Sequence, residues 1–159
     1  MIIPLLRTVD IWHGNTAAIN TKYIGRYSQK LFSVHENKKL DDSDIVRANL
    51  DIAAYDVVIV VDYGHGFLGA KWQRLIMDNA KFLAINAQTN SSNFGFNRVN
   101  EKWPRADFCV IDEVEARLAA HDAESPIEDV IRKLPYQNII VTMGGAGAIG
   151  YDGEFHYGK

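Results

Sequence analysis

Polar residues of the kinds that bind ligands follow four short apolar segments of this chain, directly after each segment ends. They lie at Asp62-Tyr63-Gly64-His65-Gly66, Asn86-Ala87-Gln88-Thr89-Asn90, Asp112-Glu113-Val114-Glu115 and Thr142-Met143-Gly144-Gly145-Ala146-Gly147. Carboxylates bind hard cations, amides both donate to and accept from hydroxyl groups, and glycine lets a ligand approach the backbone closely. These residue types predict a site for a polar ligand such as a sugar or a nucleotide.

The spacing of two of these acids predicts a metal site. Asp112 and Glu115 are three residues apart at the start of a predicted helix, so they lie on nearly the same face. Such a pair can hold Mg²⁺ through water, because this cation prefers oxygen ligands. Acids in a first turn also stabilise a helix through its dipole, and this second explanation stays open.

The other endings have structural explanations as well. Asp62 suits the N-cap of the helix that follows it, and Gly64 and Gly66 suit a turn. His65 is a candidate base, but no second histidine lies near it, and lone histidines are commonly structural or solvated. The glycine-rich ending after Thr142 lacks the Lys-Ser/Thr of a Walker A loop, so a tight hairpin turn is its alternative.

The elements that position these residues follow from the apolar pattern. Continuous apolar runs typical of buried strands lie at Val57–Val61, Phe82–Asn86, Phe108–Asp112 and Asn138–Thr142. Helical spacing predicts helices over 69–80 and 113–121, and a third that opens at Ser125-Pro126 with the serine as N-cap. Strands that alternate with helices predict an α/β fold of three layers, in which helices cover both faces of a mostly parallel sheet.

This fold class brings the polar endings together. Ligands of open parallel sheets bind at the carboxyl ends of the strands, which all lie at one edge. We therefore expect Asp62, Asn86, Asp112 and Thr142 to share one rim. The loops predicted at the opposite edge are short and carry no comparable residues.

Composition and charge exclude several classes of protein. Hydrophobic residues make up 47% and charged residues 23% of the chain, which is ordinary for a soluble globular domain. A net charge of −3 gives no electrostatic reason to expect nucleic acid or an anionic membrane as partner. Cys109 is the only cysteine, which excludes an internal disulfide, and the N-terminal residues lack the pattern of a secretory signal. We expect a cytoplasmic protein.

The two ends of the chain differ from this α/β pattern. Residues 16–37 alternate between apolar and polar and predict two extended strands. An exposed edge of these strands could pair with another chain. Residues 148–158 predict a terminal hairpin with its turn at Asp152-Gly153.

Taken together, the segments resemble the central part of a ribokinase-like (PfkB-type) carbohydrate kinase. "YDVVIVVDYGHGFL" resembles the D-Y-x-x-G segment of the heptose phosphate kinase branch, and "IIVTMGGAGAIGYDGE" resembles the family's V-T-x-G-x-x-G segment. "DEVE" stands where the family has Asn-x-x-Glu, so Asp112 replaces the usual asparagine. Residues 16–37 resemble strands that belong partly to the family's lid. The resemblance thus implies one incomplete ribokinase-like domain over 1–159, with lid strands at 16–37 and the α/β core at 55–159.

The resemblance also implies an activity, the transfer of the γ-phosphoryl group of ATP to a sugar hydroxyl with Mg²⁺ as cofactor. The residues implied to bind the nucleotide, with Glu115 also serving the metal, are Asp112, Glu115, Thr142, Gly144 and Gly147. The residues expected to face a sugar or sugar phosphate are Asp62, Gly64, His65, Asn86 and Asn90.

Two parts of the family pattern are missing from the sequence. The Gly-Ala-Gly-Asp motif, which supplies an anion hole and the catalytic base, does not occur, and neither does the amino-terminal sugar-binding portion. We therefore expect a piece of a kinase that is a poor catalyst alone, with no catalytic residue of its own. The alternative is a catalytically dead sugar- or nucleotide-binding or assembly module, which could form a homodimer through the lid strands. A third interpretation is a different α/β enzyme such as a hydrolase, although the G-x-S-x-G pattern of a nucleophile elbow does not occur.

Overall fold

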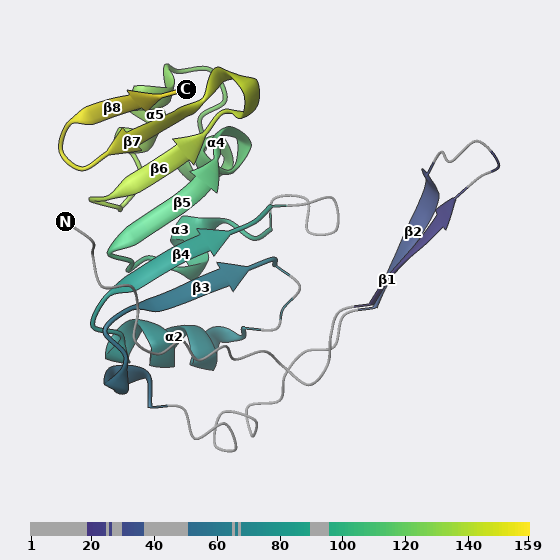
Figure 1. Cartoon of the computed structure of the whole chain (residues 1–159), viewed down its shortest axis with the longest axis horizontal. Helices are drawn as coiled ribbons and strands as arrows, with labels where there is room; N and C mark the ends of the chain where they lie inside the picture. Colours follow the sequence, from purple (N-terminus) through teal and green to yellow (C-terminus); the bar gives the residue numbers. More distant parts are fainter. Residues whose placement is uncertain are drawn as a thin grey trace, which may run out of the picture. The chain divides into compact units, whose positions relative to one another are not determined.

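The chain divides into two compact units, residues 1–38 and 39–159, and each is described by itself. The structure, a computed structural model, describes residues 19–24, 26, 30–36, 51–64, 66, 68–89 and 96–159 (Figure 1). His65 and Asn90, both predicted to face the substrate, lie outside the described residues. The division falls between the predicted lid strands and the predicted core, and the single-domain arrangement stays a prediction.

The first unit contains an antiparallel pair of strands, β1 (Ile19–Ile24) and β2 (Lys30–Glu36). Both lie within the stretch 16–37 that the alternating pattern predicts to be extended. The register shifts between Tyr23 and Ile24, near the connection to β2.

The second unit is built on a six-stranded sheet in the order β3-β4-β5-β6-β7-β8. Four parallel strands come first: β3 (Val58–Asp62), β4 (Leu83–Ala87), β5 (Phe108–Asp112) and β6 (Ile139–Thr142). The predicted hairpin, β7 (Ala148–Tyr151) and β8 (Phe155–Gly158), continues the sheet in antiparallel fashion. The predicted mostly parallel α/β sheet is confirmed.

Helices connect these strands. The described helices are α2 (Ala70–Asn79), α3 (Val99–Lys102), α4 (Glu113–Ala120) and α5 (Ile127–Arg132), with 3₁₀ turns η1 (Ile52–Ala54) and η2 (Gly144–Ala146). In the described part of the chain, no helix is long and apolar enough to cross a membrane. The predicted N-cap at Ser125 is wrong: Pro126 is the N-cap of α5, and no side chain caps this helix. The Ser125 side chain and N–H are hydrogen-bonded to the Asp122 carboxylate instead.

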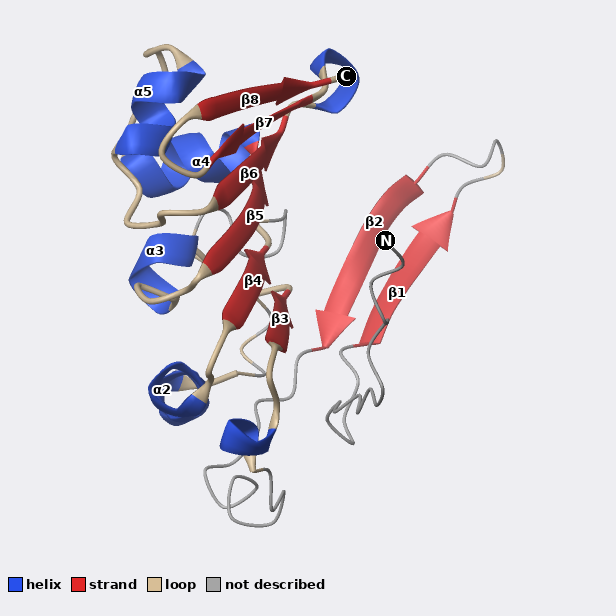
Figure 2. Cartoon of the chain, turned by 60° about the vertical axis from the view of Figure 1, so that its left-hand side comes forward, coloured by secondary structure: helices blue, strands red, loops and turns tan. Residues whose placement is uncertain are grey.

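The core lies between the sheet and these four α-helices, which all pack on one face of it (Figure 2). The buried strand residues on that face include Leu83, Ile85, Cys109, Ile111, Ile139 and Val141. On the other face of β3, Ile59 and Val61 are 68% and 52% exposed. Within the described residues the α-helices thus cover one face, and helices on the second face stay a prediction.

Candidate functional site at the carboxyl ends of the parallel strands

The four polar residues predicted to share a rim do lie at one edge of the sheet. Asp62 pairs in register with Ala87, the neighbour of Asn86, and Asp112 pairs with Thr142. We call the carboxyl ends of β3 to β6 the rim. Because side chains alternate along a strand, however, Asp62 falls on the helix-covered face with the buried Val60, whereas Asn86 and Thr142 fall on the other face.

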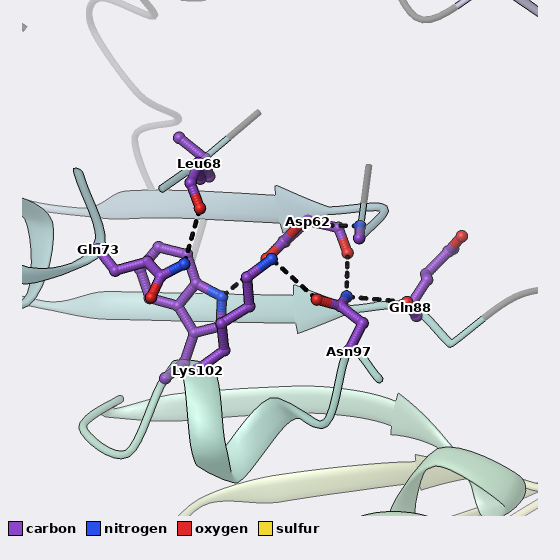
Figure 3. A network of polar contacts seen from close by, with 8 residues as sticks. Asp62, Leu68, Gln73, Gln88, Asn97 and Lys102 are labelled. Atoms are coloured by element: carbon purple, nitrogen blue, oxygen red, sulfur yellow. Dashed lines mark hydrogen bonds and ion pairs between the residues drawn. The ribbon is translucent and has the colours of Figure 1, made fainter. Parts of the chain in front are cut away.

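The Asp62 carboxylate is enclosed by partners from its own chain (Figure 3). Its Oδ1 atom accepts the Gly64 N–H at 2.9 Å. Its Oδ2 atom accepts a hydrogen bond from Lys102 Nζ at 2.7 Å and one from Trp103 Nε1 at 3.1 Å. The residue is only 4% exposed, and α2 begins after Gly69 instead, so Asp62 is not its N-cap. It stabilises the turn after β3, and any role toward a substrate is indirect.

Asn97 extends this network to the end of β4. Its Nδ2 atom donates to the Gln88 carbonyl at 2.9 Å and to the Asp62 carbonyl at 3.4 Å, and its Oδ1 atom accepts from Lys102 Nζ at 2.8 Å. The Gln88 N–H donates to the same Asp62 carbonyl at 2.8 Å. We call Asp62, Gln88, Asn97, Lys102 and Trp103 the Asp62 network, which joins the turn after β3 to the loop after β4.

The Asp112–Glu115 pair forms a capping box at the start of α4. The Asp112 carboxylate accepts the Glu115 N–H at 2.8 Å, and Glu115 Oε2 accepts the Asp112 N–H at 2.9 Å. Glu115 Oε1 accepts the Thr89 N–H at 2.7 Å, so the carboxylate also ties the end of β4 to the end of β5. Burial raises the pKa of Glu115, these two amide hydrogen bonds oppose the rise, and the charge of Asp112 adds to it.

This geometry restricts how Glu115 can serve a metal. Both carboxylate oxygens already accept amide hydrogen bonds, so Glu115 fits contact with Mg²⁺ through water rather than direct ligation. Among the described residues, no group of three or more histidine, cysteine, aspartate or glutamate side chains is placed to hold a metal ion. The exposed carboxylate of Asp112 remains the better placed of the two acids.

The glycine-rich turn after β6 combines open and crowded positions. Gly144 has a φ of 55° and open space where a side chain would stand. Gly147 has a φ of 103°, and a Cβ atom there would lie 2.1 Å from the Gly158 carbonyl oxygen. Packing against β8 therefore explains Gly147, as the hairpin alternative predicts. Gly144 and Thr142 are exposed at the rim, where a ligand can reach them.

The remaining predicted residues have mixed surroundings. Asn86 donates from Nδ2 to the Val110 carbonyl at 2.8 Å and is half-buried between β4 and β5. Gly64 and Gly66 adopt φ angles of 74° and 78°, which glycine adopts without strain, so the turn explanation holds for both. A separate groove of about 550 Å³, lined by Phe96, Val114 and other residues along α4, contains none of the predicted site residues.

Lys102 is the one member of the Asp62 network that the sequence did not suggest, whereas Asn97 lies in an asparagine-rich loop suited to hydroxyl groups and Trp103 is expected to pack. Asn97, Lys102 and Trp103 belong to or flank α3, a four-residue helix without a periodic apolar pattern. Lys102 resembles any surface lysine, because nothing local shows that an acid forty positions earlier is its partner. The one available signal was the Trp-Pro after Lys102, which marks the end of a helix.

Comparison with solved structures reveals what this architecture is similar to. One match is a protein assigned as a sugar kinase from Clostridium perfringens, with a TM-score of 0.62 and 10% identity over 86% of this chain and 44% of that one. Another is ribokinase from Arabidopsis thaliana complexed with ribose and ATP, with a TM-score of 0.61 and 9% identity over 89% and 48%. The chain has a ribokinase-like α/β fold. A carbohydrate kinase from Agrobacterium tumefaciens matches with a TM-score of 0.59 and 16% identity over 91% and 47%.

The ribokinase-like fold confirms the architecture that the motifs predicted. No protein-family model matches the sequence, and no curated protein matches it. The chain spans less than half the length of each of these solved structures. At such identities the similarity establishes the fold alone, and the heptose phosphate kinase branch stays a prediction. The ligand has to be inferred from the residues of the rim.

Proposed function

We propose that this chain forms the nucleotide-binding part of an ATP-dependent sugar kinase, which transfers the γ-phosphoryl group of ATP to a sugar hydroxyl. The observation that carries the proposal is the pairing of Asp112 with Thr142 beside the turn at Gly144. These exposed polar groups lie at the carboxyl ends of adjacent parallel strands, where open α/β sheets bind their ligands. The sugar that the D-Y-x-x-G resemblance favours is a heptose phosphate.

The β5–β6 end of the rim supplies groups that suit phosphate oxygens. The Thr142 hydroxyl is a donor, and the Gly144 turn exposes backbone without a side chain in the way. Glu115 holds the backbone of Asp112 and Thr89 and contacts the metal through water. Mg²⁺, when bound with ATP, neutralises the charge that develops on the phosphates. Phosphoryl transfer depends mainly on such positioning and charge stabilisation.

The β3–β4 end of the rim is the proposed sugar side. Gly64 and Asn86 belong to the two segments that would face the sugar, together with His65 and Asn90 from the sequence prediction. Asp62 contributes by holding the turn in place, because its carboxylate is bonded within the protein. The proposed setting is the cytoplasm, where ATP and sugar phosphates are available.

Isothermal titration calorimetry with MgATP tests the proposal on the chain as it stands. We expect saturable binding to one site with a dissociation constant between about 1 μM and 1 mM, which weakens when EDTA removes Mg²⁺. A folded sample that gives no heat with MgATP would contradict a nucleotide site.

An ATP-consumption assay then separates the kinase from its alternative. The panel consists of ribose, fructose 6-phosphate and a heptose phosphate, each with MgATP. Turnover with one of them supports a complete kinase activity. Nucleotide binding without turnover favours a nucleotide-binding module that works together with another catalytic part.

A further inference from the structure

We propose that Lys102 is a positioning residue that fixes the two sugar-side loops of the rim in one arrangement. The loops are the turn after β3, at Asp62 to Gly64, and the segment after β4 at Gln88. The proposal rests on the proposed function only where it assigns these loops to the sugar. The fixing of the loops themselves stands on the geometry of the Asp62 network.

One ammonium group connects side chains from two different segments (Figure 3). Lys102 Nζ donates to Asp62 Oδ2 at 2.7 Å and to Asn97 Oδ1 at 2.8 Å. Each of these two side chains is also hydrogen-bonded to a backbone group at the rim. Asp62 Oδ1 accepts the Gly64 N–H at 2.9 Å, and Asn97 Nδ2 donates to the Gln88 carbonyl at 2.9 Å. Lys102 is therefore a partner shared by the two side chains that hold these loops, in addition to the direct hydrogen bond from the Gln88 N–H to the Asp62 carbonyl.

Burial makes this connection strong. Asp62 is 4% and Asn97 is 3% exposed, and the Lys102 side chain is 21% exposed. The indole of Trp103 is fully buried and donates its Nε1 hydrogen to Asp62. Charged hydrogen bonds that are shielded from water are stronger than exposed ones, and a buried carboxylate without its cation is strongly unfavourable. Removal of the ammonium should therefore loosen both loops, although the backbone hydrogen bond between Gln88 and Asp62 remains.

The competing explanation is that Lys102 only adds to the stability of the whole unit. The two explanations differ in where the backbone opens. A general loss of stability speeds amide exchange in every element that opens globally, whereas loss of a positioning contact speeds exchange at the loops it holds. The amides of Gly64 and Gln88 report on the sugar side, because the first donates to the Asp62 carboxylate and the second to the Asp62 carbonyl. The Met143 amide, which donates to the Gly147 carbonyl at 2.7 Å, reports on the β5–β6 end.

Amide hydrogen exchange measured by NMR on the whole chain tests the proposal with Lys102→Met. This change keeps an unbranched side chain of similar length and removes the charge. We expect exchange at Gly64 and Gln88 to accelerate about tenfold or more, with less than about a twofold change at Met143. Lys102→Arg, which can donate to both partners, should restore most of the protection.

Two results would overturn the proposal: unchanged exchange at Gly64 and Gln88, or equal acceleration at all three amides. If Lys102→Met does not fold, the double variant Asp62→Asn with Lys102→Met removes both charges, and the same local acceleration is expected. Calorimetry with MgATP on the unaltered chain keeps the two proposals apart. Local acceleration without nucleotide binding would reject the proposed function and leave the positioning role standing.

Discussion

The two ends of the rim both consist of strand endings with polar residues, but these residues are bonded internally at one end and exposed at the other. At the β3–β4 end, polar groups are turned inward and bonded to one another: Asp62 and Asn97 are buried, and Lys102 joins them. At the β5–β6 end, Asp112 and Thr142 sit beside each other in register and are exposed. A strand ending in polar residues is therefore not by itself evidence of a ligand site.

Polar residues at the two ends of the rim should therefore differ in the effect of their substitution. Side chains at the enclosed end hold the backbone, so substitutions there should reduce stability or loosen loops. Side chains at the exposed end are available to a ligand, so substitutions there should reduce binding and leave stability nearly unchanged. Glu115 connects the two ends, because its carboxylate accepts the N–H groups of Thr89, after β4, and Asp112, at the end of β5.

The largest expected effect comes from the one crowded glycine at the exposed end. Gly147→Ala should lower the free energy of unfolding by about 3 kcal/mol or more. The new Cβ atom would meet the Gly158 carbonyl at 2.1 Å, and the φ of 103° is unfavourable for alanine. Urea denaturation followed by circular dichroism measures the change.

Gly145→Ala is the matched control for this substitution. A Cβ atom at Gly145 meets nothing within 4 Å, and its φ lies outside the range that disfavours side chains, so its effect should stay within about 0.5 kcal/mol. Similar losses for both variants would show that the turn tolerates no side chain at all, and that crowding against β8 is not what requires Gly147.

A smaller effect, with a characteristic pH dependence, is expected where the two ends join. Glu115→Gln should destabilise the unit by about 1 kcal/mol near neutral pH, because one of the two bonded amides loses its acceptor. Burial raises the pKa of Glu115 above its usual value of 4.5, so the folded state binds the proton more tightly than the unfolded state. The resulting stability is fully present below the usual pKa and is lost as pH rises through the raised one.

The difference in unfolding free energy between the unaltered chain and Glu115→Gln should therefore grow as pH falls from about 7 toward about 4.5. Urea denaturation of both proteins across this range gives the difference, and pH effects of the other carboxyl groups cancel in it. A difference that is constant, or that shrinks on acidification, would mean that the capping box leaves the pKa of Glu115 unshifted or lowered.

Much of the fold was predictable from the sequence because its signals are local. The apolar runs gave the four parallel strands to within one residue at each end, and the Asp-Gly turn gave the hairpin. The shared rim then follows from parallel topology alone. The exposed Ile59 and Val61 show where this reasoning stops. A continuous apolar run indicates a strand that is suited to burial on both faces, but it does not say what covers each face.

Whether a polar side chain at the rim is buried or exposed was not predictable, because this depends on contacts with residues distant in sequence. Asp62 and Thr142 both end strands, and only their place in the alternation sends one toward the helices and the other away. The partner of Asp62 is Lys102, on a helix too short to recognise. The capping box at Asp112 and Glu115 has a sequence signature, yet the same spacing also suits a cation, so the pattern could not separate the two roles.

The smallest expected effect on stability is at Thr142, at the exposed end of the rim. Thr142→Val keeps the β-branched shape that suits a strand and removes only an exposed hydroxyl, so the free energy of unfolding should change by less than about 0.5 kcal/mol. If the hydroxyl donates to a phosphate of ATP, the same change should weaken MgATP binding about tenfold, since a hydrogen bond to a charged group contributes about 1.5–3 kcal/mol. Calorimetry and urea denaturation on one sample measure both, and Thr142→Ser should retain the affinity. Unaltered affinity in the valine variant would place the nucleotide elsewhere on the rim. A loss of stability like that of Gly147→Ala would show that Thr142 stabilises the folded unit, as the residues of the β3–β4 end do.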